Sequence, residues 1–75
     1  MKAYVLITAH TGDVTAVVHQ MKRIEGVINA HTTFGPYDAI AIVEADDIKK
    51  VSTIVHGHIH PIPGVLNTLT CLAVE

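Results

Sequence analysis

Ile24-Glu25-Gly26-Val27-Ile28-Asn29 returns in the second half of the chain as Ile62-Pro63-Gly64-Val65-Leu66-Asn67. Each copy closes a stretch whose apolar residues have helical spacing and opens a stretch with the character of a strand. A 75-residue chain with one such copy in each half is best interpreted as two β-α-β units related by pseudo-symmetry. The repeat therefore indicates the fold, and the fold limits where a binding site can lie.

Apolar spacing and turn residues predict the elements along the chain. Strands are expected at residues 3–10, 27–34, 39–45 and 65–74, and helices at residues 14–24 and 48–59. Asp13 and Asp47 precede the helices, where a carboxylate can accept the free N–H groups of a first turn. This β-α-β-β-α-β order gives a ferredoxin-like α+β sandwich, with both helices on one face of a four-stranded antiparallel sheet. Residues 1–75 are expected to form a single domain, because so short a chain has room for one core.

The predicted strands are apolar on both faces, although the helices can cover only one. In the first strand, one face is expected to carry Ala3, Val5 and Ile7 and the other Tyr4, Leu6 and Thr8. In the last strand, one face is expected to carry Val65, Leu69 and Ala73 and the other Leu66, Leu72 and Val74. Only 16% of the residues are charged, which is little for so small a surface. We therefore expect a homodimer packed sheet to sheet, as an α/β barrel.

Charge and composition argue against several classes of protein. The net charge is −2, and the five Lys and Arg residues form no basic stripe, so direct nucleic-acid binding is not expected. No apolar run is long enough to span a bilayer, and the N-terminus fits a first strand better than a signal peptide. A single cysteine, Cys71, fits a reducing cytoplasm, and its apolar neighbours predict a small core residue rather than a nucleophile.

Three of the six histidines are clustered in His56-Gly57-His58-Ile59-His60. On a helix, His56 and His60 share a face and His58 points elsewhere, whereas a zinc site needs three or four ligands. Solvent-exposed helix histidines are the favoured interpretation. The only serine, Ser52, lies on a predicted helix, and no nucleophile is placed beside a histidine, so the pattern gives little support to an enzyme.

The turn Phe34-Gly35-Pro36-Tyr37-Asp38 between the middle strands is a candidate binding site. Gly35 and Pro36 predict a tight hairpin, in which backbone N–H groups beside the glycine can receive a carboxylate. Asp38 could receive an ammonium group, and Thr68 and Thr70 on the last strand add hydroxyl groups. Spacing alone favours a plain hairpin with strand threonines.

A resemblance to the Lrp/AsnC ligand-binding domain, also called the RAM domain, covers Tyr4 to Glu75. It rests on Thr33-Phe34-Gly35-Pro36-Tyr37-Asp38, on the two Ile-x-Gly-Val-x-x units and on the closing Thr68-Leu69-Thr70. Full-length members of that family carry an N-terminal helix-turn-helix domain. This chain begins with the first strand of the ligand domain, so the resemblance implies a stand-alone form without DNA binding of its own.

The resemblance also implies how the molecule assembles and what it binds. Dimers with their sheets face to face would form a ring of about four dimers, an octamer, and bind an amino acid or a similar effector between dimers. The site would be lined by Thr33, Gly35, Tyr37 and Asp38, with Thr68 and Thr70 from a neighbouring copy. The family implies no metal and no other cofactor.

The leading hypothesis is a non-enzymatic, cytoplasmic amino-acid sensor or modulator of Lrp/AsnC-type transcription regulators, able to co-assemble with a full-length regulator. One alternative is a small dimeric α/β-barrel enzyme, which would need a cavity lined by His and acidic side chains. Another is a His-based metal-binding protein, although metal chaperones of this topology usually carry a Cys-x-x-Cys loop where this chain has His10-Thr11-Gly12-Asp13.

Overall fold

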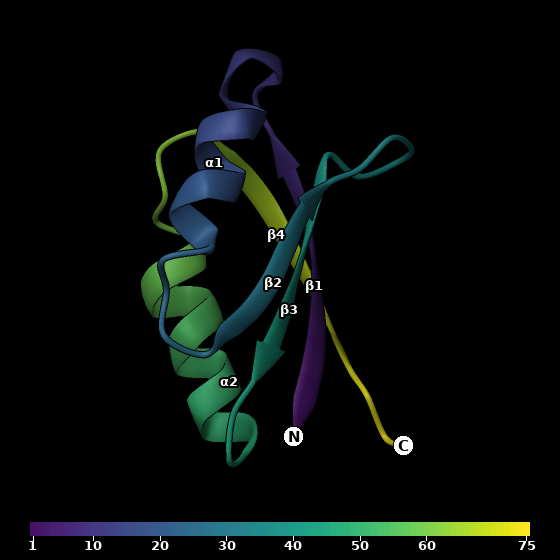
Figure 1. The fold of residues 1–75 in the computed structure, drawn as a ribbon, viewed down its shortest axis with the longest axis vertical. Helices are drawn as coiled ribbons and strands as arrows, with labels where there is room; N and C mark the ends of the chain where they lie inside the picture. The colour runs from purple at the N-terminus through teal and green to yellow at the C-terminus, as the bar shows by residue number, and fades with distance from the viewer.

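The computed structural model describes residues 1–75 and has the predicted ferredoxin-like α+β fold. Its main elements are β1 (Lys2–Ala9), α1 (Val14–Met21), β2 (Val27–Thr32), β3 (Ala39–Glu44), α2 (Ile48–Ile54) and β4 (Val65–Leu72). The strands form one antiparallel sheet in the order β2-β3-β1-β4. Both helices lie on the same face of this sheet (Figure 1). Neither is long and apolar enough to cross a bilayer.

Both predicted helices differ from the prediction at their C-terminal ends. The first begins at Val14 as predicted, directly after a 3₁₀ turn, Thr11–Asp13, but it stops at Met21 rather than at residue 24. The second passes from α2 into a π-helical turn, Val55–Ile59, which the His60 N–H closes by donating to the Val55 carbonyl at 2.8 Å.

The predicted helix caps have different outcomes. The Asp47 carboxylate accepts the Lys50 N–H at 2.8 Å, so that cap is confirmed. The Asp13 side chain accepts no such bond, so the expected cap at α1 is wrong, because the preceding 3₁₀ turn leads into this helix instead.

The two copies of the repeat form the same turn. Gly26 has a φ of 97° and Gly64 a φ of 99°, a left-handed backbone that favours glycine. Their carbonyls accept hydrogen bonds at equivalent places, from the Glu44 N–H at 2.8 Å and from the His10 N–H at 2.9 Å. The repeated glycine therefore sets how each helix returns to the sheet.

Each copy also opens its strand with a β-bulge. Pairing shifts register between Val27 and Asn29 in β2, and the matching shift in β4 falls between Val65 and Asn67. After each bulge, the Asn side-chain oxygen accepts the N–H of the next residue at 2.9 Å. Each bulge adds one residue to its strand, so the side chains that follow it point to the opposite sheet face from the one that simple alternation predicts.

The bulge in β4 overturns the predicted faces of this strand. Val65 pairs with Ala9 on the helix-covered face, whereas Leu69 pairs with Leu6 on the other face. The expected grouping of Val65 with Leu69 is therefore wrong. The extra residue, Leu66, accounts for the difference, and it is exposed.

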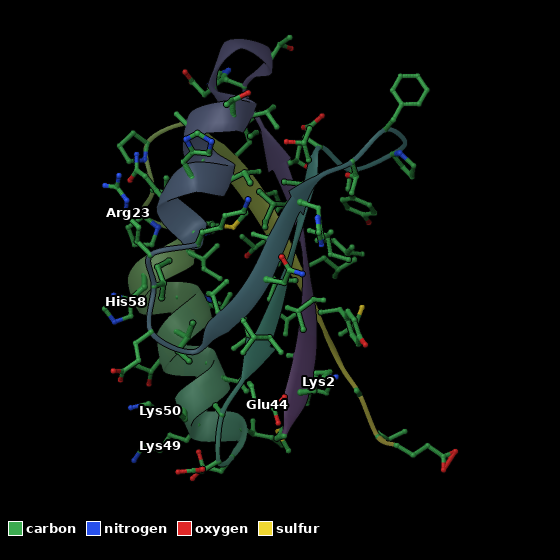
Figure 2. All side chains as sticks on the ribbon, in the orientation of Figure 1. Lys2, Arg23, Glu44, Lys49, Lys50 and His58 are labelled. Atoms are coloured by element: carbon green, nitrogen blue, oxygen red, sulfur yellow. The ribbon has the colours of Figure 1, made fainter.

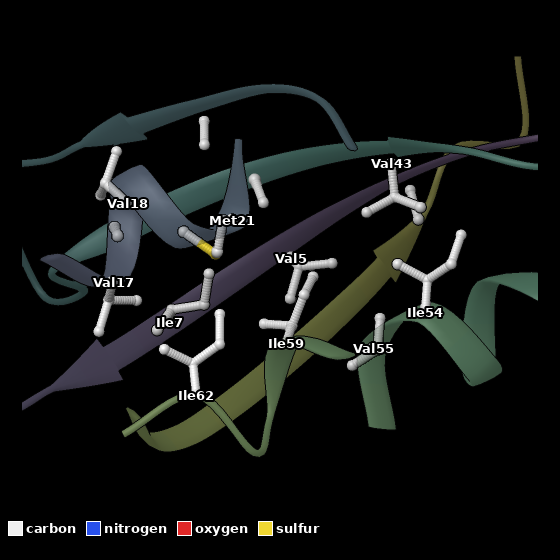
Figure 3. Close-up of a cluster of buried hydrophobic side chains, with 14 of the residues drawn as sticks. Val5, Ile7, Val17, Val18, Met21, Val43, Ile54, Val55, Ile59 and Ile62 are labelled. Atoms are coloured by element: carbon white, nitrogen blue, oxygen red, sulfur yellow. The ribbon is translucent and has the colours of Figure 1, made fainter. Parts of the chain in front are cut away.

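The core lies between the helices and one face of the sheet, and it contains no polar side chain. Figure 3 shows Met21 of α1 and Ile59 of the π-helical turn over Val5 and Ile7 of β1. The buried residues are Ala3, Val5, Ile7, Ala9, Val17, Val18, Met21, Ala30, Ala39, Ala41, Val43, Val51, Ile54, Val55, Ile59 and Ile62.

The opposite sheet face, here named the open face, is also largely apolar. Its central residues are Tyr4, Leu6, Ile40, Ile42, Leu69 and Cys71, with Thr8 and Asn67 at one end. Tyr4 is 38% exposed and Leu69 is 48% exposed. Cys71 is exposed on this face, so the prediction of a core cysteine is wrong: β4 turns it away from the helices.

Candidate functional site

The β2–β3 connection, residues 33–38, is an open loop rather than the predicted tight hairpin. The Thr33 hydroxyl donates to the Tyr37 carbonyl at 2.8 Å, and the Thr33 N–H donates to the Asp38 carbonyl at 3.0 Å. Beyond this base the loop projects past the end of the sheet (Figure 1). At its tip Phe34 is fully exposed, and nothing lies within 4 Å of where a Cβ on Gly35 would be. The loop is therefore fixed at its base and uncovered at its tip.

Asp38 has a structural role that the sequence did not suggest. Its Oδ2 atom accepts the Ala9 N–H at 2.9 Å, and its own N–H donates to the Ile7 carbonyl at 2.9 Å. The half-buried side chain thus ties the loop to the end of β1. Only Oδ1 of the carboxylate has no hydrogen-bond partner in the chain. One of the two oxygens is therefore already used within the protein, and the other is available to an ammonium group.

Two of the predicted site residues meet in one cavity at the loop end of the open face. This cavity of about 240 Å³ joins Tyr37 of the loop to Thr68 of β4. Its other lining residues are Leu6, Thr8, Asn67 and Leu69. The sequence did not identify these four, since their proximity follows from the pairing of Leu6 with Leu69 and of Thr8 with Asn67.

The remaining predicted residues lie outside this cavity. Thr33 and Gly35 lie in the exposed part of the loop. Asp38 lies at the base of the loop, where it bonds to Ala9. Thr70 faces the helix layer, where it lines a separate cavity of about 200 Å³ between α2 and β4. In a single chain, therefore, Thr70 does not share a cavity with Tyr37 or Thr68.

The chemistry of the loop-end cavity is that of hydrogen bonding beside an apolar wall. Tyr37 and Thr8 supply hydroxyl groups that can donate or accept. Thr68 pairs with the buried Ile7, so its side chain, like that of Thr70, is directed to the helix-covered face. The Asn67 side-chain oxygen already accepts the Thr68 N–H, which leaves the Asn67 NH₂ group as a donor. The lining includes no carboxylate, imidazole, amine or thiol. Such a cavity is suited to holding a small polar molecule by several neutral hydrogen bonds.

The clustered histidines do not converge. His56 and His58 lie in the π-helical turn and His60 follows it, and all three are exposed. His56 lines the cavity that contains Thr70, whereas His58 lines another beside Arg23. No three His, Cys, Asp or Glu side chains are placed to hold a metal ion.

Comparison with solved structures identifies similar chains of nearly the same length. A protein from Thermus thermophilus is 30% identical and superposes with a TM-score of 0.94 over 99% of this chain and 92% of that one. A hypothetical protein from Pyrococcus horikoshii is 26% identical, with a TM-score of 0.90 over 99% of this chain and 89% of that one.

Chains about twice as long share the fold at lower identity. Escherichia coli AsnC is 17% identical, with a TM-score of 0.91 over 99% of this chain and 50% of that one. A Neisseria meningitidis transcriptional regulator, solved in complex with L-Met, is 15% identical, with a TM-score of 0.81 over 99% and 49%. The chain thus spans about half the length of these regulators.

Sequence comparison places the chain in a family. No curated protein matches it. The family model of the Lrp/AsnC ligand binding domain matches residues 2–75, and the confirmed fold and the 30%-identical relative agree with that match. The chain therefore belongs to the Lrp/AsnC ligand-binding domain family.

Proposed function

We propose that this protein is an oligomeric binding domain for an amino acid or a similar small effector. In this proposal it acts as a sensor or modulator of Lrp/AsnC-type transcription regulators, without catalysis or DNA binding of its own. The observation that carries the proposal is the cavity in which Tyr37 of the loop meets Thr68 of β4. The L-Met complex of the N. meningitidis regulator supports the chemical class of the ligand.

The cavity offers suitable partners for an amino acid. Hydroxyl and amide donors from Tyr37, Thr8 and Asn67 would bind the carboxylate. Asp38 does not line the cavity, and its free oxygen at the base of the loop would bind an ammonium group that extends beyond the cavity. Leu6 and Leu69 would contact an apolar side chain.

The remaining residues of the proposed site would complete it in the assembly. We propose that Thr33 and Gly35 of the loop contact the same ligand. Thr70 would join them only across a subunit boundary, because within one chain it lines a different cavity. The complete site would therefore exist only in the oligomer.

A thermal-shift screen against the twenty amino acids, with keto acids and zinc as comparison compounds, tests the ligand class. A ligand at about 100 times its Kd adds roughly 2.7 kcal/mol per site. In a domain this small, that corresponds to a rise in Tm of roughly 10–20 °C. A reproducible shift with amino acids supports the proposal. No shift with any of them contradicts it, and a shift with zinc alone favours a metal-binding protein.

Substitutions then place the ligand. Tyr37→Phe and Thr8→Val each remove one hydroxyl from the cavity with little change in shape. Each should weaken binding by about tenfold, the cost of leaving one ligand group without its partner. Thr15→Val removes an exposed hydroxyl from α1, far from the cavity, and should leave the Kd unchanged. Equal effects of all three variants would show that the ligand binds elsewhere.

The open face supports the assembly that the proposal needs. We propose that two copies pack the central parts of these faces together, which would cover Tyr4, Ile42 and Cys71 and leave the loop-end cavity at the margin of the interface. Cys71 is the only cysteine and is exposed in the single chain, so its rate of reaction with a thiol reagent reports directly on this interface. Slow labelling of the native protein and fast labelling after unfolding are expected.

The charge variant Ile42→Lys tests the same interface. It places a cation near the centre of the open face, where an unpaired charge cannot be buried without a large cost. We expect monomers by light scattering and fast labelling of Cys71. The matched control, Ile48→Lys, changes an exposed residue on α2 and should remain dimeric. Fast Cys71 labelling in the unaltered protein would contradict sheet-to-sheet packing.

Higher assembly and the regulatory partner are separate parts of the proposal. We propose that dimers assemble further, into an octamer or a similar ring, and that the chain co-assembles with full-length Lrp/AsnC regulators in the cytoplasm. Co-elution with the regulators of its own cell tests the partner. Absence of any mixed species would exclude co-assembly and leave effector binding as the function.

A further inference from the structure

A third cavity lies on the outer side of the helix layer, away from the loop and the open face. It has a volume of about 340 Å³, which is within the range of small-molecule sites. It is formed where the end of α1, the turn before β2 and the outer side of α2 meet. Its lining residues are Arg23, Ile24, Glu25, Lys50, Thr53, Ile54 and His58.

The cavity gathers two cationic side chains and one imidazole from separate elements. Arg23 follows α1, Lys50 belongs to α2, and His58 lies in the π-helical turn. Figure 2 shows Arg23, His58 and Lys50 in that order along the outer side of the helix layer. Turns of the π type are uncommon and frequently occur at functional sites, which adds weight to this location.

The two permanent cations have no acidic partner within the chain. Its one ion pair joins the amino group of Met1 to Glu44 at 3.9 Å, so no carboxylate lies within ion-pair distance of Arg23 or Lys50, although Glu25 lines the same cavity. Neither side chain donates a hydrogen bond to the protein. Their donors are therefore available to a ligand, and the Arg23 guanidinium matches the two oxygens of a phosphate or carboxylate.

The rest of the lining narrows the class of ligand. Ile24 and Ile54 provide apolar contact. The Thr53 hydroxyl already donates to the Lys49 carbonyl at 3.0 Å, so it can only accept from a ligand. Glu25 is the single acid of the lining and provides a second acceptor. A molecule that carries both an oxyanion and hydroxyl groups fits this arrangement better than a bare ion does.

We propose that this helix-layer cavity binds a small organic phosphate or carboxylate that also carries hydroxyl groups. Arg23 and the neighbouring His58 hold the oxyanion, Lys50 adds a donor at the other end of the cavity, and Glu25 with Thr53 accept from the hydroxyls. The site is independent of the proposed amino-acid site, because the two cavities share no residue.

Amide chemical-shift titrations of the ¹⁵N-labelled protein test this proposal, with glycerol 3-phosphate and inorganic phosphate as probes at constant ionic strength. Saturable shifts are expected around Arg23 and His58, with the lower Kd for glycerol 3-phosphate. Arg23→Gln and Lys50→Gln should each raise that Kd by about tenfold, since each removes a charge-assisted contact. Lys22→Gln is the matched control, because it makes the same charge change outside the cavity. The Tyr37→Phe variant should bind the probe unchanged.

Three results would overturn the proposal. Non-saturating shifts would mean that the phosphates act only as counterions. An equal loss in Lys22→Gln and Arg23→Gln would mean that net charge rather than the cavity attracts them. Shifts confined to Tyr37 and Thr68 would place the probe in the loop-end cavity instead, and would leave the amino-acid proposal standing.

Discussion

The two repeated glycines allow one substitution to be made twice in the same backbone conformation. Gly26→Ala and Gly64→Ala each place a Cβ on a residue whose φ is close to 100° (97° and 99°). That left-handed conformation costs an L-residue about 1–2 kcal/mol, and the cost should be equal at the two sites. Any further difference between the variants must come from what the new methyl group meets.

The neighbours of the two glycines differ. At Gly26 the new Cβ would lie 2.5 Å from Ile54 Cδ1, which is the end of a flexible side chain. At Gly64 it would lie 2.6 Å from Asp13 Cβ, an atom bonded directly to the backbone. Ile54 can change its rotamer, whereas Asp13 can move only with its turn. Overpacking of that kind adds about 1–3 kcal/mol, so we expect a loss of about 1–2 kcal/mol for Gly26→Ala and about 2–5 kcal/mol for Gly64→Ala.

Thermal unfolding by circular dichroism at a fixed protomer concentration measures the difference. In a domain of this size, each kcal/mol lowers Tm by about 4–8 °C. Gly12→Ala is the control, because Gly12 has no positive φ and nothing lies within 4 Å of a new Cβ there. Its free energy of unfolding should change by no more than about 0.5–1 kcal/mol. If Gly64→Ala is no less stable than Gly26→Ala, the contact with Asp13 does not constrain the turn and the reasoning is refuted.

Three further substitutions test the loop, a helix cap and the core. Asp38→Ala removes the acceptor of the Ala9 N–H and should lower the free energy of unfolding in urea by about 1–3 kcal/mol. Asp38→Asn keeps an oxygen at this place and should retain most of that stability. Equal losses in the two variants would contradict the hydrogen bond. Asp47→Ala removes the cap of α2 and should lower the free energy of unfolding by about 0.5–2 kcal/mol in calorimetry. The control Asp46→Ala should leave it nearly unchanged, and a larger loss for Asp46→Ala than for Asp47→Ala would contradict the cap. Ile59→Val, at a fully buried residue, should cost about 0.5–1.5 kcal/mol in chemical unfolding, and a neutral result would mean that this part of the core is loosely packed.

The spacing of apolar residues predicted the helices and strands well, because it depends only on residues that are close together in the sequence. Residues such as Val17, Val18 and Met21 recur with the helical period, and they do form the buried stripe of α1. The errors fell at element ends. The first helix stops at Met21, and the second widens into a π-helical turn at Val55, because the backbone bonds of a last turn depend on what packs beside it.

The candidate site was only partly predictable. The resemblance selected Tyr37 and Thr68, which do share a cavity, but Thr70 lies in a different one. Asp38 was expected to be free for a ligand, yet one of its oxygens accepts the Ala9 N–H, from a residue remote in sequence. Thr8 and the other wall residues could not be identified without the strand register.

The sequence by itself determined the order of elements, the repeated glycine turn and the apolar character of both sheet faces. These properties depend on neighbouring residues, whose backbone preferences and spacing are local. Tertiary structure alone decided which residues face each other: the bulge at Leu66 set the faces of β4, and chain folding brought Arg23, Lys50 and His58 to one cavity. Register and proximity depend on pairing between distant segments, and no local preference encodes that pairing.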